Sequence, residues 1–144
     1  MGRLENNNSV DLELIFRNVY RKIREEMQLL LREYVTTNEY MVLKLLSEVP
    51  MRSSDLSRAL QVSASHITSV TDSLVEKGLI ERNRSSKDRR VVDLLLTDEG
   101  KALVKQLNKI KRDSMKQHLE IFTEEERNVL IKLFRKFEAH LNQQ

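Results

Sequence analysis

The sequence predicts a mainly α fold (α+β) that contains one two-stranded hairpin. Across the 144 residues, apolar side chains recur at intervals of three and four, and only three glycines and one proline interrupt them. Residues 52–97 differ, because two short helical patterns are followed by two alternating stretches with a cluster of basic residues between them. Two short helices followed by a hairpin with a cationic tip form a winged helix-turn-helix, here flanked by long helices.

Two helices are predicted before the winged segment. Residues 10–33 carry apolar side chains at helical spacing and are expected to form one long amphipathic helix. Thr36 and Glu39 have the spacing of a capping box, in which each side chain accepts a hydrogen bond from the other residue's backbone N–H. They open a second helix, which Pro50 and the residue before it help to close.

The helix-turn-helix pair begins with a short positioning helix. Ser53, Ser54 or Asp55 could provide its N-cap, because their side chains accept hydrogen bonds from backbone N–H groups of the first turn. After a tight turn at residues 61–63, Ser63 is expected to cap the second helix. The apolar face of that second helix comprises Ile67, Val70, Thr71 and Leu74.

The opposite surface of the second helix is small and polar. It comprises Ser65, Ser69 and Asp72, with His66 and Thr68 on its flanks. A helix that enters the major groove of DNA needs such hydrogen-bonding side chains near its N-terminus, where base edges and phosphates are within reach. Two of these residues have an alternative role: Asp72 could pair with a neighbouring cation, and His66 could be an exposed helix residue that contacts no base.

The predicted hairpin carries a concentrated positive charge. Gly78 tolerates a positive φ and ends the second helix, one strand begins at residues 79–82, and its partner occupies residues 91–96. Four basic residues and one acid in the loop at 83–90 leave a local charge of +3: Arg84, Lys87, Arg89 and Arg90 against Asp88. Such cations release counterions from phosphates, and a narrow minor groove favours an inserted arginine. Double-stranded DNA is therefore the expected partner.

Long helices are predicted on the C-terminal side as well. Thr97 caps a helix that extends to about residue 119, and Thr123 with Glu126 repeats the capping-box spacing for the last helix. The terminal helices present more apolar surface than the wing and three short helices can cover in so small a protomer. A second copy of the chain is the simplest cover, although the terminal helices of a monomer could also fold back on the core.

A homodimer gives the chain a functional division and a symmetric target. We expect residues 1–35 to form an N-terminal dimerisation helix, residues 36–100 the winged helix-turn-helix DNA-binding domain, and residues 101–144 the C-terminal helices of the dimerisation lobe. Twofold symmetry then predicts an inverted-repeat operator, with the second helices spaced by about 34 Å, one turn of DNA.

Several short motifs in this segment resemble those of the MarR family of transcriptional regulators. They are Ser63-x-Ser65-x-Ile67-Thr68, Leu74-x-x-x-Gly78-Leu79-Ile80-x-Arg82, Asp88-x-Arg90 and Leu96-Thr97-x-x-Gly100. Each motif is weak alone, but their order and spacing together are specific. The resemblance is strongest over residues 36–103 and extends over most of the chain through the helix pattern.

The resemblance implies roles for individual residues. The arginine matching Arg90 enters the minor groove, the aspartate matching Asp88 helps to hold it, and the second helix reads the major groove. Phosphate contacts come from both helices and the wing. The candidate DNA-binding residues are therefore Ser53, Ser54, Ser65, His66, Thr68, Ser69, Asp72, Arg82, Arg84, Lys87, Asp88, Arg89 and Arg90.

The resemblance also implies a small, often aromatic or phenolic effector, held in a crevice between the dimerisation and DNA-binding lobes. No residue pattern identifies such a ligand. Residues that could contribute to the crevice are Tyr20, Tyr34, Tyr40, Met41 and His118, although apolar and aromatic residues at helical spacing more often belong to a core. The chain contains no cysteine, which excludes disulfides, thiolate zinc sites and the thiol sensing that some MarR-like regulators use.

Other classes of function find little support. The three histidines show no paired ligand spacing and no glycine-rich phosphate loop occurs, so neither an enzyme nor a cofactor or metal is expected. No apolar run approaches about 18 residues and the first ten residues lack a signal-peptide core, which predicts a cytoplasmic protein without a membrane partner. A winged helix that binds proteins is the alternative, but it would need an apolar outer face on the second helix.

These observations together predict a homodimeric, sequence-specific DNA-binding transcriptional regulator. A repressor is expected, because a dimer that covers a promoter blocks polymerase without needing any activation surface.

Overall fold

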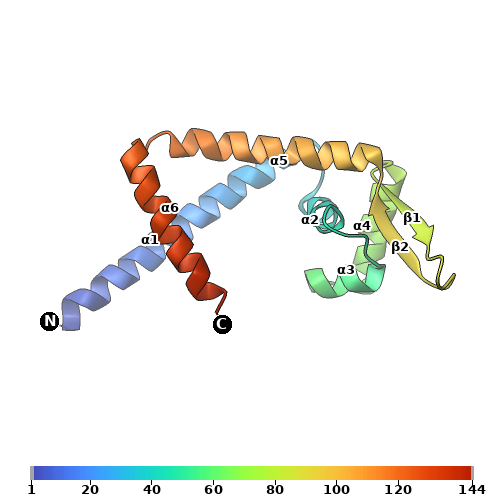
Figure 1. Cartoon of the computed structure of the whole chain (residues 1–144), viewed down its shortest axis with the longest axis horizontal. Helices are drawn as coiled ribbons and strands as arrows, with labels where there is room; N and C mark the ends of the chain where they lie inside the picture. Colours follow the sequence, from blue (N-terminus) through green and yellow to red (C-terminus); the bar gives the residue numbers. More distant parts are fainter. Residues whose placement is uncertain (1, 144) are drawn as a thin grey trace. The chain divides into compact units, whose positions relative to one another are not determined.

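The computed structural model describes the backbone of residues 2–143 and the side chains of residues 8–143. The elements, in chain order, are α1 (Gly2–Leu31), α2 (Thr37–Leu46), α3 (Ser53–Leu60), α4 (Ala64–Glu76), β1 (Ile80–Arg84), β2 (Val92–Leu96), α5 (Asp98–Leu119) and α6 (Glu124–Leu141) (Figure 1). They form two compact units, and the division between them falls within α5, between Leu107 and Asn108. The first unit contains the winged helix-turn-helix, so the predicted mainly α fold with a single hairpin is confirmed.

The hairpin of the first unit is an antiparallel pair with a third, short partner. Ile80 lies opposite Leu96 and Arg84 opposite Val92. Met51, just before α3, also pairs with β2, donating to the carbonyl of Leu94 at 3.1 Å and accepting from its N–H at 2.8 Å. This pairing ties the start of the helix-turn-helix to the wing, and the sequence pattern did not predict it.

The core of the first unit joins α2, α3, α4, the hairpin and the start of α5. Side chains with almost no exposed surface are Val42, Leu43, Leu56, Ile67, Leu74, Ile80, Leu94 and Leu107. The predicted inner face of α4 is buried as expected, with Ile67, Val70, Thr71 and Leu74 turned inward. Because apolar burial fixes this face, the polar side of α4 is turned to solvent.

Most predicted helix caps are confirmed. The hydroxyl of Ser63 accepts a hydrogen bond from the backbone N–H of His66 at 3.2 Å. Thr123 and Glu126 form both bonds of a capping box, at 2.9 and 3.2 Å. These side chains satisfy backbone N–H groups that have no partner inside their own helices.

The predicted start of α3 was wrong. None of Ser53, Ser54 and Asp55 is its N-cap, because the cap position belongs to Arg52. Asp55 instead accepts a hydrogen bond from the backbone N–H of Arg52 at 3.4 Å. Since Met51 is held in the strand pairing, the chain turns into the helix directly after it, one residue earlier than the cap propensities suggested.

Two further expectations need correction. Thr36 accepts from the backbone N–H of Glu39 at 3.2 Å, but the Glu39 carboxylate completes no capping box and bonds Lys77 instead. The first helix begins at Gly2 rather than at residue 10 and ends at Leu31. Its first residues lack apolar periodicity, yet an established helix gains one hydrogen bond for each residue it adds.

The end of α4, the hairpin and the start of α5 meet at one junction. Gly78 has a φ of +73°, which allows the chain to leave α4. The Thr97 hydroxyl donates to the carbonyl of Gly78 at 2.7 Å and accepts from the N–H of Gly100 at 3.0 Å. Gly100 lies so close to the backbone of Leu79 that a Cβ added to Gly100 would overlap the Leu79 carbonyl oxygen. The predicted cap of α5 at Thr97 is thus confirmed. The same hydroxyl also connects the start of α5 to the chain that leaves α4.

The terminal helices carry much exposed apolar surface. No residue of α6 is buried, and α1 is exposed along most of its described length. Exposed apolar side chains include Leu12, Leu14, Ile15 and Val19 on α1, and Val129, Ile131, Leu133 and Leu141 on α6. None of the helices in the described part of the chain is long and apolar enough to cross a membrane.

We predict that Gly100→Ala destabilises the protein by about 3 kcal/mol, because the new methyl group would collide with the Leu79 carbonyl and force the α4–α5 junction apart. Urea unfolding measures this change, with Lys101→Ala at the exposed neighbouring position as the control. In an ordinary helix position the same substitution stabilises by about 1 kcal/mol, so a more stable Gly100→Ala variant would contradict the close contact.

Candidate nucleic-acid interface

The turn between α3 and α4 is formed by the chain itself. Gln61 has a φ of +54°, in the left-handed region, and the N–H of Val62 donates to the carbonyl of Ser57 at 3.1 Å. The Ser57 hydroxyl in turn donates to the carbonyl of Val62. The sequence predicted a tight turn here, but glutamine gives no signal for the left-handed conformation, which usually belongs to glycine or asparagine.

The outer face of α4 is hydrophilic, as predicted. Ser65, Thr68, Ser69 and Asp72 are exposed, and His66 is partly buried. The Thr68 hydroxyl donates to the carbonyl of Ala64 at 2.9 Å, so it can offer a ligand only its acceptor lone pairs. Short hydroxyl side chains let this face of the helix approach another surface closely while still forming hydrogen bonds.

Asp72 forms an ion pair with Arg82 of β1. The two side chains are 60% and 40% exposed, so solvent screens the pair and its contribution to stability is small. The pair still brings the carboxylate of α4 and the guanidinium of the hairpin together at the base of the wing. The alternative role considered for Asp72, pairing with a neighbouring cation, is therefore what the structure shows.

The wing loop has a defined turn. The N–H of Ser85 donates to the carbonyl of Val91 at 2.8 Å, and the N–H of Arg90 donates to the Asp88 carboxylate at 3.0 Å. The Arg90 Nε lies 3.9 Å from the same carboxylate oxygen, yet its side chain is 95% exposed. Asp88 thus holds the backbone of Arg90 while the guanidinium extends into solvent. The remaining loop cations, Arg84, Lys87 and Arg89, are also exposed.

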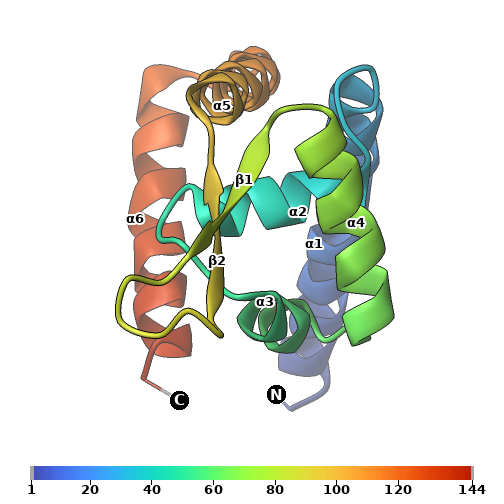
Figure 2. The same cartoon turned by 90° about the vertical axis from the view of Figure 1, so that its right-hand side faces the viewer.

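These parts gather at one end of the first unit. Figure 2 shows α3, the N-terminal end of α4 and the loop between β1 and β2 on the side opposite the start of α5. Ser53 and Ser54 open α3 and are exposed there. Arg52, at the N-cap position of α3, and Arg58, within α3 and 3.9 Å from the Asp55 carboxylate, are also exposed cations, and the sequence prediction omitted both. The helical spacing of Leu56, Ala59 and Leu60 could have suggested Arg58, whereas Arg52 lies just before the predicted helix.

Comparison with known proteins identifies the relatives of this fold. The sequence profile of the MarR family matches residues 35–92. A Bacillus subtilis (strain 168) protein, named as an uncharacterized HTH-type transcriptional regulator, YpoP, is 37% identical over 129 residues, 89% of this chain and 92% of its own. The chain belongs to the MarR family. It is therefore a transcriptional regulator of the winged helix-turn-helix type.

Two further similarities agree with membership of the MarR family. The HTH-type transcriptional repressor MdtR of Bacillus subtilis (strain 168) is 33% identical over 118 residues, which cover 81% of this chain and 76% of that protein. The crystal structure of YusO from Bacillus subtilis superimposes with a TM-score of 0.80 and 29% identity, covering 93% of this chain and 96% of that one. The YusO match covers so much of this chain that it includes parts of both terminal helices as well as the winged segment.

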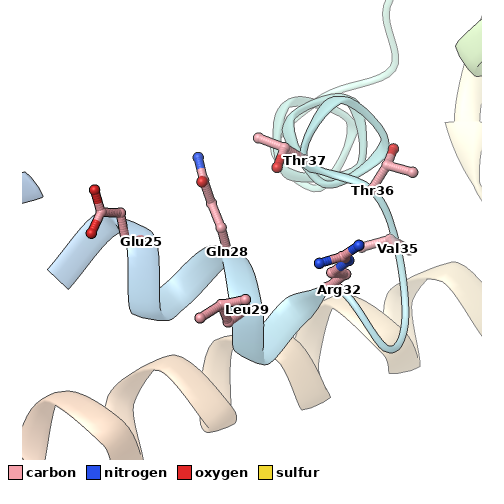
Figure 3. Close-up of a pocket in the computed structure, with 7 residues that line it drawn as sticks. All are labelled: Glu25, Gln28, Leu29, Arg32, Val35, Thr36 and Thr37. Carbon is pink, nitrogen blue, oxygen red and sulfur yellow. The ribbon is translucent and has the colours of Figure 1, made fainter. Parts of the chain in front are cut away.

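A pocket lies where α1 ends and α2 begins. It encloses about 560 Å³ and is lined by Glu25, Gln28, Leu29, Arg32, Val35, Thr36 and Thr37 (Figure 3). None of the aromatic and sulfur-containing residues suggested for an effector crevice lines it. Among residues 8–143, no group of three or more histidine, aspartate or glutamate side chains is placed to hold a metal ion.

We predict that Ser63→Ala lowers the free energy of unfolding by about 1 kcal/mol, because α4 loses the side-chain acceptor for the His66 N–H. Ser63→Asp is the matched variant: it keeps an N-cap acceptor and should retain the stability of the unsubstituted chain. Thermal unfolding measures the stability of both variants. If Ser63→Ala and Ser63→Asp lose the same stability, the side-chain acceptor at the N-cap does not stabilise α4.

Proposed function

We propose that this MarR-family regulator binds double-stranded DNA sequence-specifically as a homodimer, recognises an inverted-repeat operator and represses transcription. The observation that carries the proposal is the common placement of the polar outer face of α4 and the cationic wing at one end of the first unit. A regulator that binds chromosomal DNA works in the cytoplasm, and we propose no catalytic activity for it.

The two surfaces suit the two grooves of B-DNA. The major groove is wide enough for an α-helix, and hydroxyl side chains such as Ser65 and Ser69 can donate to or accept from base edges there. The wing places Arg90 at an exposed tip, where a narrow minor groove offers the deepest negative potential. Ser53 and Ser54, at the start of α3, are suited to phosphate contacts. A protein-binding winged helix would instead need an apolar outer face on α4.

Exposed apolar surface on α1 and α6 supports the homodimer. Soluble monomers rarely expose such contiguous apolar helix faces, and the side chains include Ile15, Val19, Leu133 and Leu141. We therefore assign residues 1–35 and 101–144 to a dimerisation lobe and residues 36–100 to DNA binding. Val104 and Leu107 are buried in the first unit, so α5 also serves the DNA-binding head over its first turns.

We also propose that the pocket at the α1–α2 junction holds a small aromatic effector. The planar guanidinium of Arg32 can stack on an aromatic ring, while Gln28 and Thr37 offer hydrogen bonds to polar substituents. Such a ligand releases DNA only if it binds the DNA-free geometry more tightly than the DNA-bound one.

We predict that Arg90→Ala weakens operator binding at least tenfold and lowers the slope of log affinity against log salt by about one unit, because one fewer cation displaces phosphate counterions. Ser69→Ala should change base preference with less effect on this slope. Fluorescence anisotropy over a range of salt concentrations measures both, with Lys44→Ala, an exposed lysine of α2, as the control. Unchanged affinity and slope in Arg90→Ala would contradict the role of the wing.

We predict that Leu133→Lys converts the dimer into a monomer, because it places a charge in an apolar helix face that the second copy must bury. Gel filtration with light scattering at micromolar concentration measures the mass. The neighbouring substitution Lys132→Ala should leave a dimer. An unsubstituted chain that is monomeric under these conditions would contradict the symmetric operator.

A further inference from the structure

One ion pair joins the start of α2 to the end of α4. The Lys77 Nζ donates to the Glu39 Oε2 at 2.7 Å, across 38 positions of sequence. Glu39 lies in the first turn of α2 and only 6% of its side chain is exposed, whereas Lys77 is the C-cap residue of α4 and its side chain is 43% exposed. The acid is therefore buried and its cation reaches it from the surface.

Helix electrostatics favour this arrangement at both ends. A carboxylate in the first turn of α2 complements the partial positive charge of that helix terminus, and an ammonium group at the last turn of α4 complements the partial negative charge there. A buried carboxylate is costly without a partner, so the Glu39 charge needs Lys77 in this position. The requirement places the C-terminal end of α4 at a fixed distance from α2.

Thr97 forms further hydrogen bonds to the two residues that follow this end of α4. Thr97 bonds the carbonyl of Gly78 through its hydroxyl at 2.7 Å and the carbonyl of Leu79 through its N–H at 3.1 Å. The inner face of α4 packs through apolar contacts, which fix which side of the helix is buried but carry little directional preference. The Asp72–Arg82 pair ties the middle of α4 to β1, and the Glu39–Lys77 pair ties its C-terminal end to α2.

A small tilt of α4 at its C-terminal end matters because it displaces the N-terminal end of the helix by a larger distance. Its 13 residues span about 20 Å, so a tilt of about 10° displaces its N-terminal end by about 3.4 Å. That displacement equals about one base pair along the DNA axis. Ser65 lies in the first turn of α4 and Ser69 in its N-terminal half, where the proposed base contacts occur.

We propose that Glu39 and Lys77 are positioning residues that set the tilt of α4 and thereby the half-site spacing the dimer accepts. The proposal rests on the proposed function, since it requires α4 to read DNA in both subunits. Neither residue contacts DNA in this account. The pair acts by aligning the reading helix, so its loss changes which spacing binds best rather than weakening all binding equally.

The test uses a series of operators whose half-sites are moved apart or together by one base pair. Affinity for each is measured with the full chain and with Lys77→Met, Lys77→Arg and the double variant Glu39→Gln/Lys77→Met. The double variant removes the pair without leaving a buried charge, so it should fold even if Lys77→Met does not. Lys44→Met removes an exposed lysine of α2 and serves as the matched control.

We expect the double variant to reduce the discrimination between the best spacing and its one-base-pair neighbours roughly tenfold, a coupling of ordinary size. Lys77→Arg keeps a cation beside Glu39 and should restore the discrimination, and Lys44→Met should retain it. A double variant that loses the same factor of affinity for every spacing, or none, overturns the positioning role while DNA binding stands. A wild-type chain that binds no operator overturns the proposed function and the positioning role together.

Discussion

The hydroxyl of Thr97 joins the three elements on which the reading surface depends. Through it, Gly78 just after α4, the end of β2 and the first turn of α5 share one hydrogen-bonded junction. Gly100 allows α5 to approach the chain after α4 without a side chain between them. If this junction opened, α4 and the wing would no longer keep a constant relation, and neither groove contact could be made at a fixed register.

From that junction the hairpin and α4 extend side by side toward the end where α3 lies (Figure 2). The apolar face of α4 is used in the core, which leaves its hydroxyl side chains and the loop cations for a partner. The Met51–Leu94 pairing anchors α3 to the same hairpin. Rigid placement of α3, α4 and the wing explains how a short polar helix face and a few cations could act together on one duplex.

Local patterns predicted most of this architecture. The inner face of α4, the caps at Ser63 and Thr123, the helix end at Gly78 and the wing all follow from spacing within a few residues. Contacts between distant segments escaped prediction. The N-cap position of α3 falls on Arg52 because Met51 pairs with Leu94, 43 residues later. The Glu39 carboxylate bonds Lys77, 38 residues away, and does not complete the expected capping box. Helical spacing alone reveals neither partner.

The same distinction between local patterns and long-range contacts applies to the candidate DNA-binding residues. The exposure of Ser65, Thr68 and Ser69 could be predicted from the apolar face on the other side of α4. The Asp72–Arg82 pair could not, because it depends on how the hairpin packs beside α4. Selection of bound fragments from genomic DNA by the purified protein tests the central claim most directly. The account predicts enrichment of one inverted repeat whose half-sites are about one DNA turn apart, roughly 34 Å. Recovery of fragments that share no motif would contradict sequence-specific reading by two symmetric heads.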